Sequence, residues 1–394
     1  MKRRILSVIL ALTIICSLFV TAITAYAVAT YSNTETEHIA SLPSKTIDGI
    51  SYRGVGGIAI GKNKNSMFVV KAQELGSTST EDYALFYDFP DINNTENRHH
   101  YLLPMAGHAN GMTIGPKDVY VCGWSLGGSN VDDGNTYNNW IVVIPRELIS
   151  ALRRCSDSNI YMDSYCESHP EVPKYYVMHP KTKTVLDDGS IEYNDYQEEI
   201  KSITLYNNSS SFIISYAPLN TDGAAGDIAY TVARIENYNG EKVFVVSEDP
   251  DDIFIVKNNA ANKKAVGQDI CYSSGNGLFI PKWYGKNSSN NKYYNPTKTV
   301  ILWANIDGEC SYKTIDGVAY RYYEPDRIVI DKSKEKDGNG EIRYTSFEPE
   351  SIAFTKSGEL LFSCNTRRNP DATGAYADSV FKLTHSGGQN FVLN

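Results

Sequence analysis

The chain has 394 residues, 42% of them hydrophobic and 21% charged, which is enough for one large domain or two ordinary ones. Its formal net charge is −9 and it contains no long basic block, which argues against nucleic acid or an anionic membrane surface as a partner. The 28 tyrosines, with frequent Asn, Ser and Gly, are typical of exposed β-strands and polar loops rather than of helices.

The N-terminal segment has the three parts of a secretory signal. Residues 2–4 are Lys-Arg-Arg, residues 5–20 are almost wholly apolar, and Ala25-Tyr26-Ala27 places small residues where a signal peptidase cleaves. We predict a signal peptide over residues 1–27 and an extracellular or cell-surface mature protein, whose charge without the three basic residues is −12. The apolar run is nearly long enough to span a bilayer, so an uncleaved membrane anchor is the alternative.

One short apolar signature recurs five times along the rest of the chain. Its copies are Gly57-Ile58-Ala59-Ile60, Gly111-Met112-Thr113-Ile114, Ser202-Ile203-Thr204-Leu205, Asp269-Ile270-Cys271-Tyr272 and Ser351-Ile352-Ala353-Phe354. Each copy is followed by a polar turn and a second strand, then by a longer polar loop and a third strand. Four of the five units also offer a fourth, more polar strand. Four antiparallel strands, repeated with variable loops, indicate a β-propeller.

The predicted fold is therefore all-β: a single domain over residues 28–394, with five blades of four antiparallel strands. The second strands are expected at 66–70, 118–122, 211–215, 277–280 and 359–363, and the third at 84–89, 140–144, 229–235, 299–306 and 379–383. The last unit runs out of chain, so its outer strand is expected from the segment around residues 35–50, which would close the ring. One short helix is expected at residues 145–154, where Pro precedes an apolar stripe.

This arrangement of repeats resembles the five-bladed propeller group, which includes certain glycosidases, nucleotide-hydrolysing apyrases and a sugar-binding lectin. The resemblance covers nearly all of the mature chain but is architectural, because no motif specific to one family accompanies it. It implies a fold far more than a function.

Two local patterns suggest chemistry outside this scheme. Gly123-Trp124-Ser125-Leu126-Gly127 matches the nucleophile elbow of serine hydrolases, but the turn-rich stretch that follows lacks the helix which that elbow needs, so a hairpin loop is favoured. Cys155 and Cys166 flank a loop and could form a disulfide in an oxidising compartment.

The repeat also predicts where a site would lie. The innermost strands begin at one end of the central channel, and the loops between second and third strands open at that end; we call it the long-loop face. Its loops are residues 71–83, 123–139, 216–228, 281–298 and 364–378. His108 and Asn110 at the channel mouth and the aromatic residues Trp124, Tyr216, Trp283, Tyr284 and Tyr376 are candidate binding residues. Aromatic rings among amides and carboxylates suit a glycan or a protein ligand.

The channel mouth also carries acidic residues from different units. Asp269, Glu350 and Glu199 are candidate catalytic residues, because glycoside hydrolysis needs two carboxyl groups across the scissile bond. The same carboxylates, with Asn110 and Ser202, could instead hold Ca²⁺, which prefers oxygen ligands.

The leading functional hypothesis is a secreted or surface-held monomer that binds a glycan or an extracellular protein on its long-loop face. The alternative is a hydrolase of glycans or phosphate esters that uses the channel-mouth carboxylates, with or without Ca²⁺. A serine hydrolase at Ser125 is a distant third.

Overall fold

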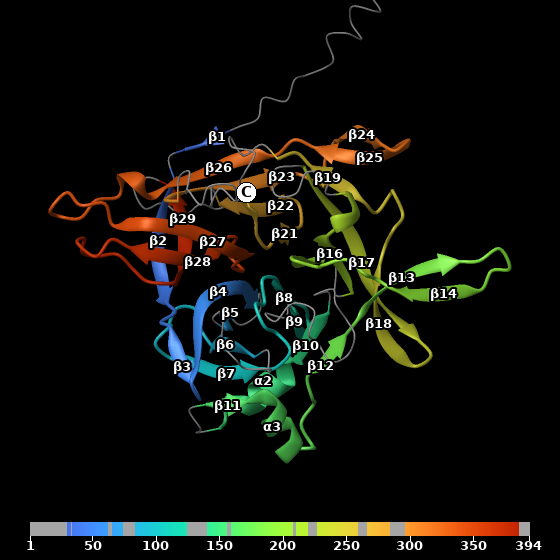
Figure 1. The fold of residues 1–394 in the computed structure, drawn as a ribbon, viewed down its shortest axis with the longest axis horizontal. Coiled ribbons are helices and arrows are strands. Elements are labelled where there is room, and N and C mark those ends of the chain that lie inside the picture. Colours follow the sequence, from blue (N-terminus) through green and yellow to red (C-terminus); the bar gives the residue numbers. More distant parts are fainter. Residues whose placement is uncertain are drawn as a thin grey trace, which may run out of the picture.

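The computed structural model describes residues 30–32, 34–61, 65–73, 83–123, 140–155, 159–207, 210–219, 227–258, 266–283 and 296–385. Within these residues the chain is almost entirely β, and five separate sheets surround a common centre (Figure 1). The predicted signal segment lies outside the described residues. No helix among the residues that are described is long and apolar enough to cross a bilayer.

The first two sheets follow each other along the chain. The first contains β3 (Lys45–Ile47), β4 (Ile50–Gly61), β5 (Ser66–Gln73), β6 (Ala84–Phe89), β7 (His99–Leu103) and β11 (Ile160–Tyr161). The second contains β8 (Met112–Ile114), β9 (Asp118–Cys122), β10 (Ile141–Pro145) and β12 (Tyr176–Met178). In both sheets the strand that carries the signature pairs with the second strand, which pairs with the third, as the sequence predicts.

The third sheet is the largest. Its core is β15 (Ile203–Tyr206), β16 (Ser211–Ser215), β17 (Ile228–Tyr238) and β18 (Glu241–Val246). The hairpin β13 (Pro180–Val185) with β14 (Ile191–Asp195) joins β18, while β19 (Phe254–Val256) links β17 to the hairpin β24 (Ser311–Ile315) with β25 (Val318–Tyr323). The prediction of four strands per unit is wrong here, because two loop hairpins supply strands to a neighbouring sheet.

The remaining two sheets complete the set. The fourth contains β20 (Val266–Gly267), β21 (Cys271–Ser273), β22 (Gly277–Trp283), β23 (Lys298–Ala304), β26 (Asp326–Asp331) and β1 (Thr30–Tyr31). The fifth contains β27 (Tyr344–Phe354), β28 (Leu360–Arg368), β29 (Ser379–His385) and β2 (Thr34–Ser41). The N-terminal strand β2 pairs antiparallel with β29, so the predicted closure of the last unit by an N-terminal strand is confirmed; Figure 1 shows the blue β2 beside the red strands.

The helices differ from the prediction. The expected helix is present as α2 (Arg146–Leu152), which buries Leu148, Ile149 and Leu152 and starts after Pro145. A second helix, α3 (Met162–Ser168), was not predicted, because seven residues are too few for a helical period to be recognised; it buries Met162 and Cys166. Cys155 and Cys166 are both free thiols that pack in one hydrophobic cluster, so the proposed disulfide between them is not formed.

Alternating side chains explain why the sheets stack. In β5, Phe68 and Val70 belong to the cluster shared with the second sheet, while Met67 and Val69 belong to the cluster shared with the fifth. Five such clusters occur among the described residues, and each joins two neighbouring sheets. One of them joins the fifth sheet to the first. Both faces of a central strand are therefore apolar, as its sequence requires.

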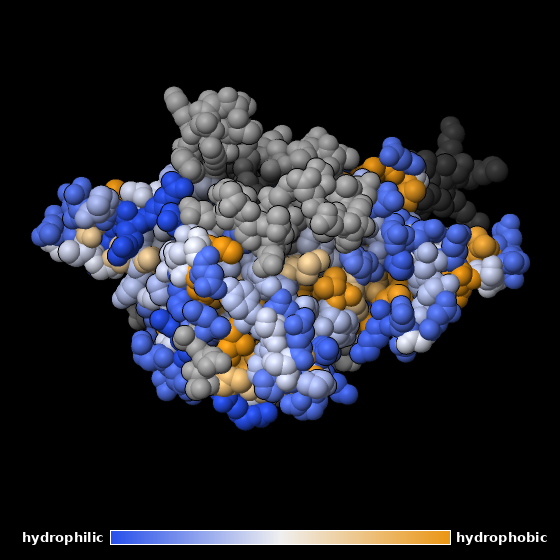
Figure 2. All heavy atoms as spheres, turned by 60° about the horizontal axis from the view of Figure 1, so that its bottom comes forward, coloured by the Kyte–Doolittle hydropathy of each residue, from blue (hydrophilic) through white to orange (hydrophobic). Residues whose placement is uncertain are grey.

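The outer parts of the molecule are polar. On the side shown in Figure 2, hydrophilic residues predominate and hydrophobic residues occur in small scattered groups. The connections at the outer edge are tight turns: Asn239-Gly240 and Asp316-Gly317 both have positive φ angles, as two-residue hairpins of this type require. Three apolar residues near the tip of the β13–β14 hairpin, Val185, Leu186 and Ile191, are exposed.

Ring closure by β2 can be tested by a polar substitution on its buried side. Ala40 is 2% exposed and lies in the cluster between the fifth and first sheets, whereas the adjacent Ser41 is exposed. Ala40→Asp should lower the melting temperature by several degrees, because an unpaired charge in an apolar cluster costs about 2 kcal/mol or more. Ser41→Asp, measured in the same thermal unfolding assay, is the control and should change little. Equal effects would contradict the buried pairing of β2.

Candidate functional site

The five signature strands line the centre of the molecule. β4 lies against β8, β8 against β15, β15 against β21, β21 against β27, and β27 against β4 again. The five inner strands therefore form a closed ring around a central channel. Because they run in the same sense, residues that precede the signature lie towards the long-loop face and residues that follow it lie towards the opposite end.

Asp269 lies at the centre of this channel and is completely buried. One of its oxygens accepts hydrogen bonds from the backbone N–H of Met112 at 3.1 Å and from the Ser351 hydroxyl at 2.5 Å, and the other accepts one from the N–H of Ile203 at 3.2 Å. Ser351 Oγ in turn accepts the N–H of Ile58 at 3.0 Å. Through one carboxyl group and one hydroxyl, all five inner strands are connected.

The space around the Asp269 carboxyl group is closely packed. A Cβ atom added to Gly111 would lie 3.0 Å from Asp269 Oδ1 and 3.1 Å from Cys122 Sγ, so the glycine of this signature copy makes room for the carboxyl group. Burial raises the pKa of Asp269 to about 7, and the hydrogen bonds from Ser351 and the backbone amides oppose that shift. A group held in this way is inaccessible to a substrate.

This geometry does not favour the catalytic and calcium-binding roles predicted for Asp269. Its two oxygens already face N–H and O–H donors in a fully buried position. Ser202 is 2% exposed beside the same carboxyl group. Within the described part of the chain, no group of three His, Cys, Asp or Glu side chains is arranged to hold a metal ion.

Glu199, His108 and Asn110, the other polar residues predicted at the channel mouth, differ in their surroundings. Glu199 forms an ion pair with Lys201 at 3.0 Å. His108 is largely buried, which lowers the pKa of its imidazole to about 4 and keeps the ring neutral at pH 7. Asn110 Oδ1 is a buried acceptor without a hydrogen-bond partner among the described residues. Of this set, Asn110 is the one that retains an unused polar atom at the channel mouth.

Of the predicted aromatic binding residues, three are described, and two of these three are buried. Tyr216 and Trp283 are 7% and 8% exposed, and the Trp283 indole N–H donates to the Pro296 carbonyl at 3.1 Å, so both rings are packing groups. Tyr376 is exposed and stacks on His38, with ring centroids 3.7 Å apart. Trp124, Ser125 and Tyr284 lie outside the described residues. Of the three predicted aromatic residues that are described, only Tyr376 presents an exposed ring.

A pair of carboxyl groups occupies the long-loop side of the Asp269 network. Glu348 and Glu350 flank Pro349 on β27, where the pairing with β28 is irregular. Burial raises the pKa of Glu348 to about 7, partly opposed by Gln268 and Arg367. Burial, reinforced by the charge of Glu348, holds the pKa of Glu350 well above its usual range. Both carboxyl groups therefore keep their protons to a higher pH than exposed glutamates do.

Two amides connect this pair to the neighbouring sheets. Gln268 Nε2 donates to Glu348 Oε1 at 3.2 Å, and Asn365 Nδ2 donates to Glu350 Oε1 at 2.5 Å. Asn365 Oδ1 also accepts the N–H of Val55 at 2.6 Å, which ties the pair to the first sheet. Glu350 is 6% exposed, while Glu348 is only partly buried. Glu348 is thus the member of the pair that a ligand can reach.

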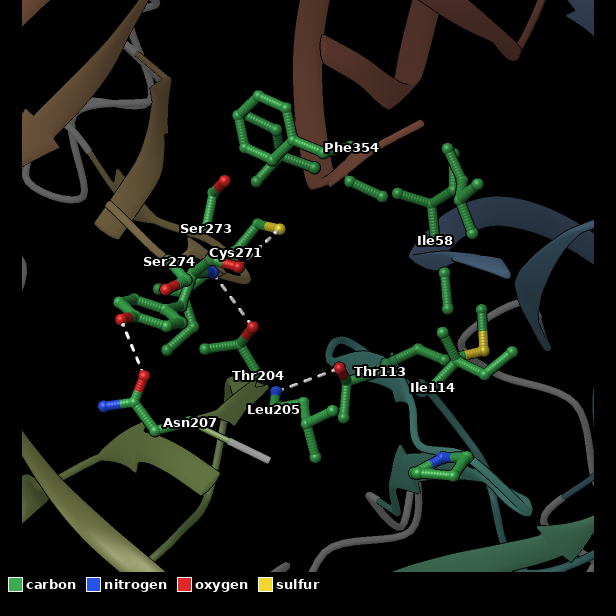
Figure 3. Close-up of a pocket in the computed structure, with 18 residues that line it drawn as sticks. Ile58, Thr113, Ile114, Thr204, Leu205, Asn207, Cys271, Ser273, Ser274 and Phe354 are labelled. Carbon is green, nitrogen blue, oxygen red and sulfur yellow. Dashed lines mark hydrogen bonds between the residues drawn. The ribbon is translucent and has the colours of Figure 1, made fainter. Parts of the chain in front are cut away.

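A cavity of about 520 Å³ opens at the opposite end of the channel. All five inner strands line it, with side chains such as Ile58, Thr113, Thr204, Cys271 and Phe354 (Figure 3). The hydroxyls of Thr113 and Thr204 accept backbone N–H groups of the next strand, each at 3.0 Å, so they hold the ring together. Its titratable lining groups are a thiol and a phenol, so we place the candidate acid–base site at the long-loop end.

Two lysines are buried near the long-loop ends of their strands, with opposite surroundings. Lys71 of β5 donates to the Leu42 carbonyl at 2.7 Å and pairs with Asp378 at 3.1 Å. Lys282 of β22 is 1% exposed, and its side-chain amine makes no hydrogen bond or ion pair with the described residues. Burial lowers the pKa of this amine to about 7. The unfolded chain therefore binds one more proton than the folded chain between pH 7 and the ordinary lysine pKa of 10.5.

Replacing Lys282 by Met should stabilise the protein. At neutral pH we expect the free energy of unfolding to rise by about 1–3 kcal/mol, because an unpaired buried amine is exchanged for an apolar chain. The wild-type stability should increase as the pH rises from 7 towards 10.5, and the variant should lack that increase. Lys71→Met is the matched control and should destabilise, since it leaves Asp378 without its partner. Urea unfolding at several pH values measures both; a destabilised Lys282→Met would contradict the assignment.

Comparisons with known proteins do not assign the chain to a family. No protein-family model and no curated protein matches it. Among solved structures, the periplasmic gluconolactonase PpgL of Pseudomonas aeruginosa is 10% identical with a TM-score of 0.32, over 89% of this chain and 99% of that one. A chain from an S. cerevisiae complex of Dbp5 with Nup159, Gle1, IP6 and ADP is 9% identical with a TM-score of 0.30, over 90% and 97%. Similarity this low supports no functional conclusion.

Proposed function

We propose that the chain is a five-bladed β-propeller, each sheet a blade, and a hydrolase of a sugar-like substrate at the long-loop end of its channel. The observation that carries this proposal is the Glu348–Glu350 pair, in which a partly buried carboxyl group has its pKa raised to about 7. A catalytic acid works best when its pKa is near the working pH. A carboxyl group with a perturbed pKa that a ligand can reach from a channel is a candidate for a functional group.

In the proposed reaction Glu348 is the general acid. Protonated Glu348 donates its proton to the leaving oxygen while water adds to the carbon or phosphorus of the scissile bond, and the resulting carboxylate takes a proton back from that water. Glu350 is a positioning residue, because it is buried and acts on substrate only through Glu348 and Asn365. Glu348 ends the reaction protonated again, so water is the only co-reactant that the step needs.

The polar groups around the pair favour a polyhydroxylated substrate. Gln268 and Asn365 bring side-chain amides to the two carboxyl groups. Asn110 Oδ1 at the same end needs a donor, which a sugar hydroxyl supplies. An extracellular location, a signal peptide over residues 1–27 and a monomeric state remain part of the proposal.

A second candidate is binding of a glycan or an extracellular protein without turnover. The unused acceptor of Asn110 and the exposed ring of Tyr376 favour it. The two functions differ in one measurable property, which is release of product.

A substrate panel separates the two candidates. The purified chain is incubated with 4-nitrophenyl glycosides, 4-nitrophenyl phosphate, 4-nitrophenyl esters and sugar lactones, and product release is followed at pH values on both sides of 7. Turnover of a glycoside, phosphate or lactone supports the hydrolase. Retention of glycans on an array with no turnover of any probe would establish the binding role and end the proposal of catalysis.

A further inference from the structure

A second cavity, of about 630 Å³, lies at the end of the molecule opposite to Glu348. It is bounded by the start of β5, the β8–β9 turn, α2, the segment before β12 and the start of β18. Pro116, in the β8–β9 turn, also lines the channel cavity, so the two openings are neighbours. We call this second cavity the basic groove.

Basic side chains dominate the groove although the chain as a whole is acidic. Lys117, Arg146, Lys174 and Lys242 line it, and none of the four forms an ion pair with any described residue. A fifth cation in the lining, Arg153, is neutralised by a bidentate contact with Asp88. Asp118 and Glu147 are the acidic residues of the lining, so an excess of positive charge remains in a chain of net charge −9. An anionic ligand is therefore favoured.

A buried hydroxyl provides a second indication of a ligand. Ser66 is 2% exposed and lines the groove, and its Oγ has no hydrogen-bond partner among the described residues. A buried hydroxyl without a partner costs free energy, which a bound donor or acceptor recovers. The lining of the groove therefore offers a polar group, the Ser66 hydroxyl, in addition to its basic side chains.

The rest of the lining distinguishes between kinds of anion. The four cations come from separate elements, so they suit charges spread along a chain better than one phosphate group. Pro116, Pro145 and Pro173 add rigid apolar surface. The described lining contains no Asn or Gln side chain, the groups that hold sugar hydroxyls by paired hydrogen bonds. These features favour a peptide over a glycan.

We infer that the basic groove binds an acidic peptide segment, whose carboxylates pair with Lys117, Arg146, Lys174 and Lys242 and whose backbone reaches Ser66. This inference goes beyond the proposed hydrolase and does not depend on it, because the groove and Glu348 lie at opposite ends of the channel. Salt should weaken the complex strongly, since the paired side chains are at the surface.

The test uses fluorescein-labelled decaglutamate and fluorescence anisotropy with the full chain. The wild type should bind the peptide at low ionic strength. The double variant Lys174→Glu/Lys242→Glu should bind about tenfold or more weakly, because two attractive contacts become repulsive. The matched control Lys334→Glu/Lys356→Glu changes the net charge equally at exposed positions outside the groove and should bind like the wild type.

Two results would overturn the inference. Equal weakening in the groove variant and the control would mean that only net charge matters. Tighter binding of polygalacturonate than of decaglutamate, compared at equal concentration of carboxylates, would identify the ligand as an anionic glycan. Turnover on the substrate panel should be the same in all three proteins, so failure of this inference is distinct from failure of the proposed hydrolase.

Discussion

Asp269→Ala is expected to cause the largest loss of stability of any single substitution considered for this chain. The change leaves the N–H groups of Met112 and Ile203 and the Ser351 hydroxyl without their acceptor in a site that is fully buried. Each buried donor left unpaired costs about 1–3 kcal/mol, so the total loss is on the order of 5 kcal/mol. Urea or thermal unfolding measures it.

A matched control separates burial from hydrogen bonding. Asp188 also accepts a backbone N–H and a hydroxyl, both from Ser190 at 2.9 and 2.6 Å, but it is exposed in the β13–β14 turn. Asp188→Ala should therefore lower stability far less than Asp269→Ala does, because water replaces the lost partner. If Asp269→Ala were as mild as Asp188→Ala, the connection of the five inner strands through Asp269 would be unimportant for stability.

The pH dependence of the unfolding free energy gives an independent measure of how the fold affects Asp269. The folded pKa of Asp269 is raised from 3.8 to about 7, so the unfolded chain holds fewer protons than the folded chain between these values. The stabilisation from the protonated group is complete below pH 3.8 and is lost as the pH rises through 7. Asp269→Asn does not titrate, so its unfolding free energy should lack this decrease.

Glu348→Gln is expected to remove at least about 99% of the turnover on whichever probe the wild type hydrolyses. Glutamine keeps the size of the side chain and can still accept from Gln268, but it has no proton to donate. Loss of a general acid typically lowers the rate by about 10²–10⁴-fold. Substrate affinity, measured by calorimetry or by competition, should stay close to that of the wild type.

The wild-type pH–rate profile should decline as the pH rises through about 7, where Glu348 loses its proton. Glu359→Gln is the control: Glu359 is also partly buried, but it lies in the turn at the other end of β27 and contacts Ser357 and Lys382. It should retain wild-type turnover. Full activity of Glu348→Gln would refute the assignment of the acid, and loss of binding alone would make Glu348 a binding residue.

Strand positions were predictable because they depend on local alternation. The third strand of the first unit was predicted at 84–89 and is β6 over the same residues, and the same holds for β9 and β16. Closure by an N-terminal strand was also predictable, because an apolar sheet at the end of a ring needs a partner. The extra strands of the third sheet were not, because the β24–β25 hairpin lies more than fifty residues from β19 in the chain and pairs with it only in the fold.

The chemistry of the channel depended on the tertiary structure. Asp269 was expected to face solvent as a catalytic or calcium-binding carboxylate, and instead it accepts hydrogen bonds from three other inner strands. Glu348 was not among the predicted catalytic residues, because its raised pKa depends on burial and its hydrogen bond to Gln268 depends on the fold, neither of which the sequence reports. Lys282 likewise looks like any strand lysine until its burial is known.

By itself the sequence determined that this is an all-β repeat whose five signatures mark five inner strands, because strand alternation and turn residues act over a few neighbours. It also determined that acidic residues gather at one end of those strands. Only the tertiary structure decided which of them is a fully buried connector and which is partly exposed with a raised pKa. That distinction depends on desolvation and on donors contributed by strands far apart in the chain.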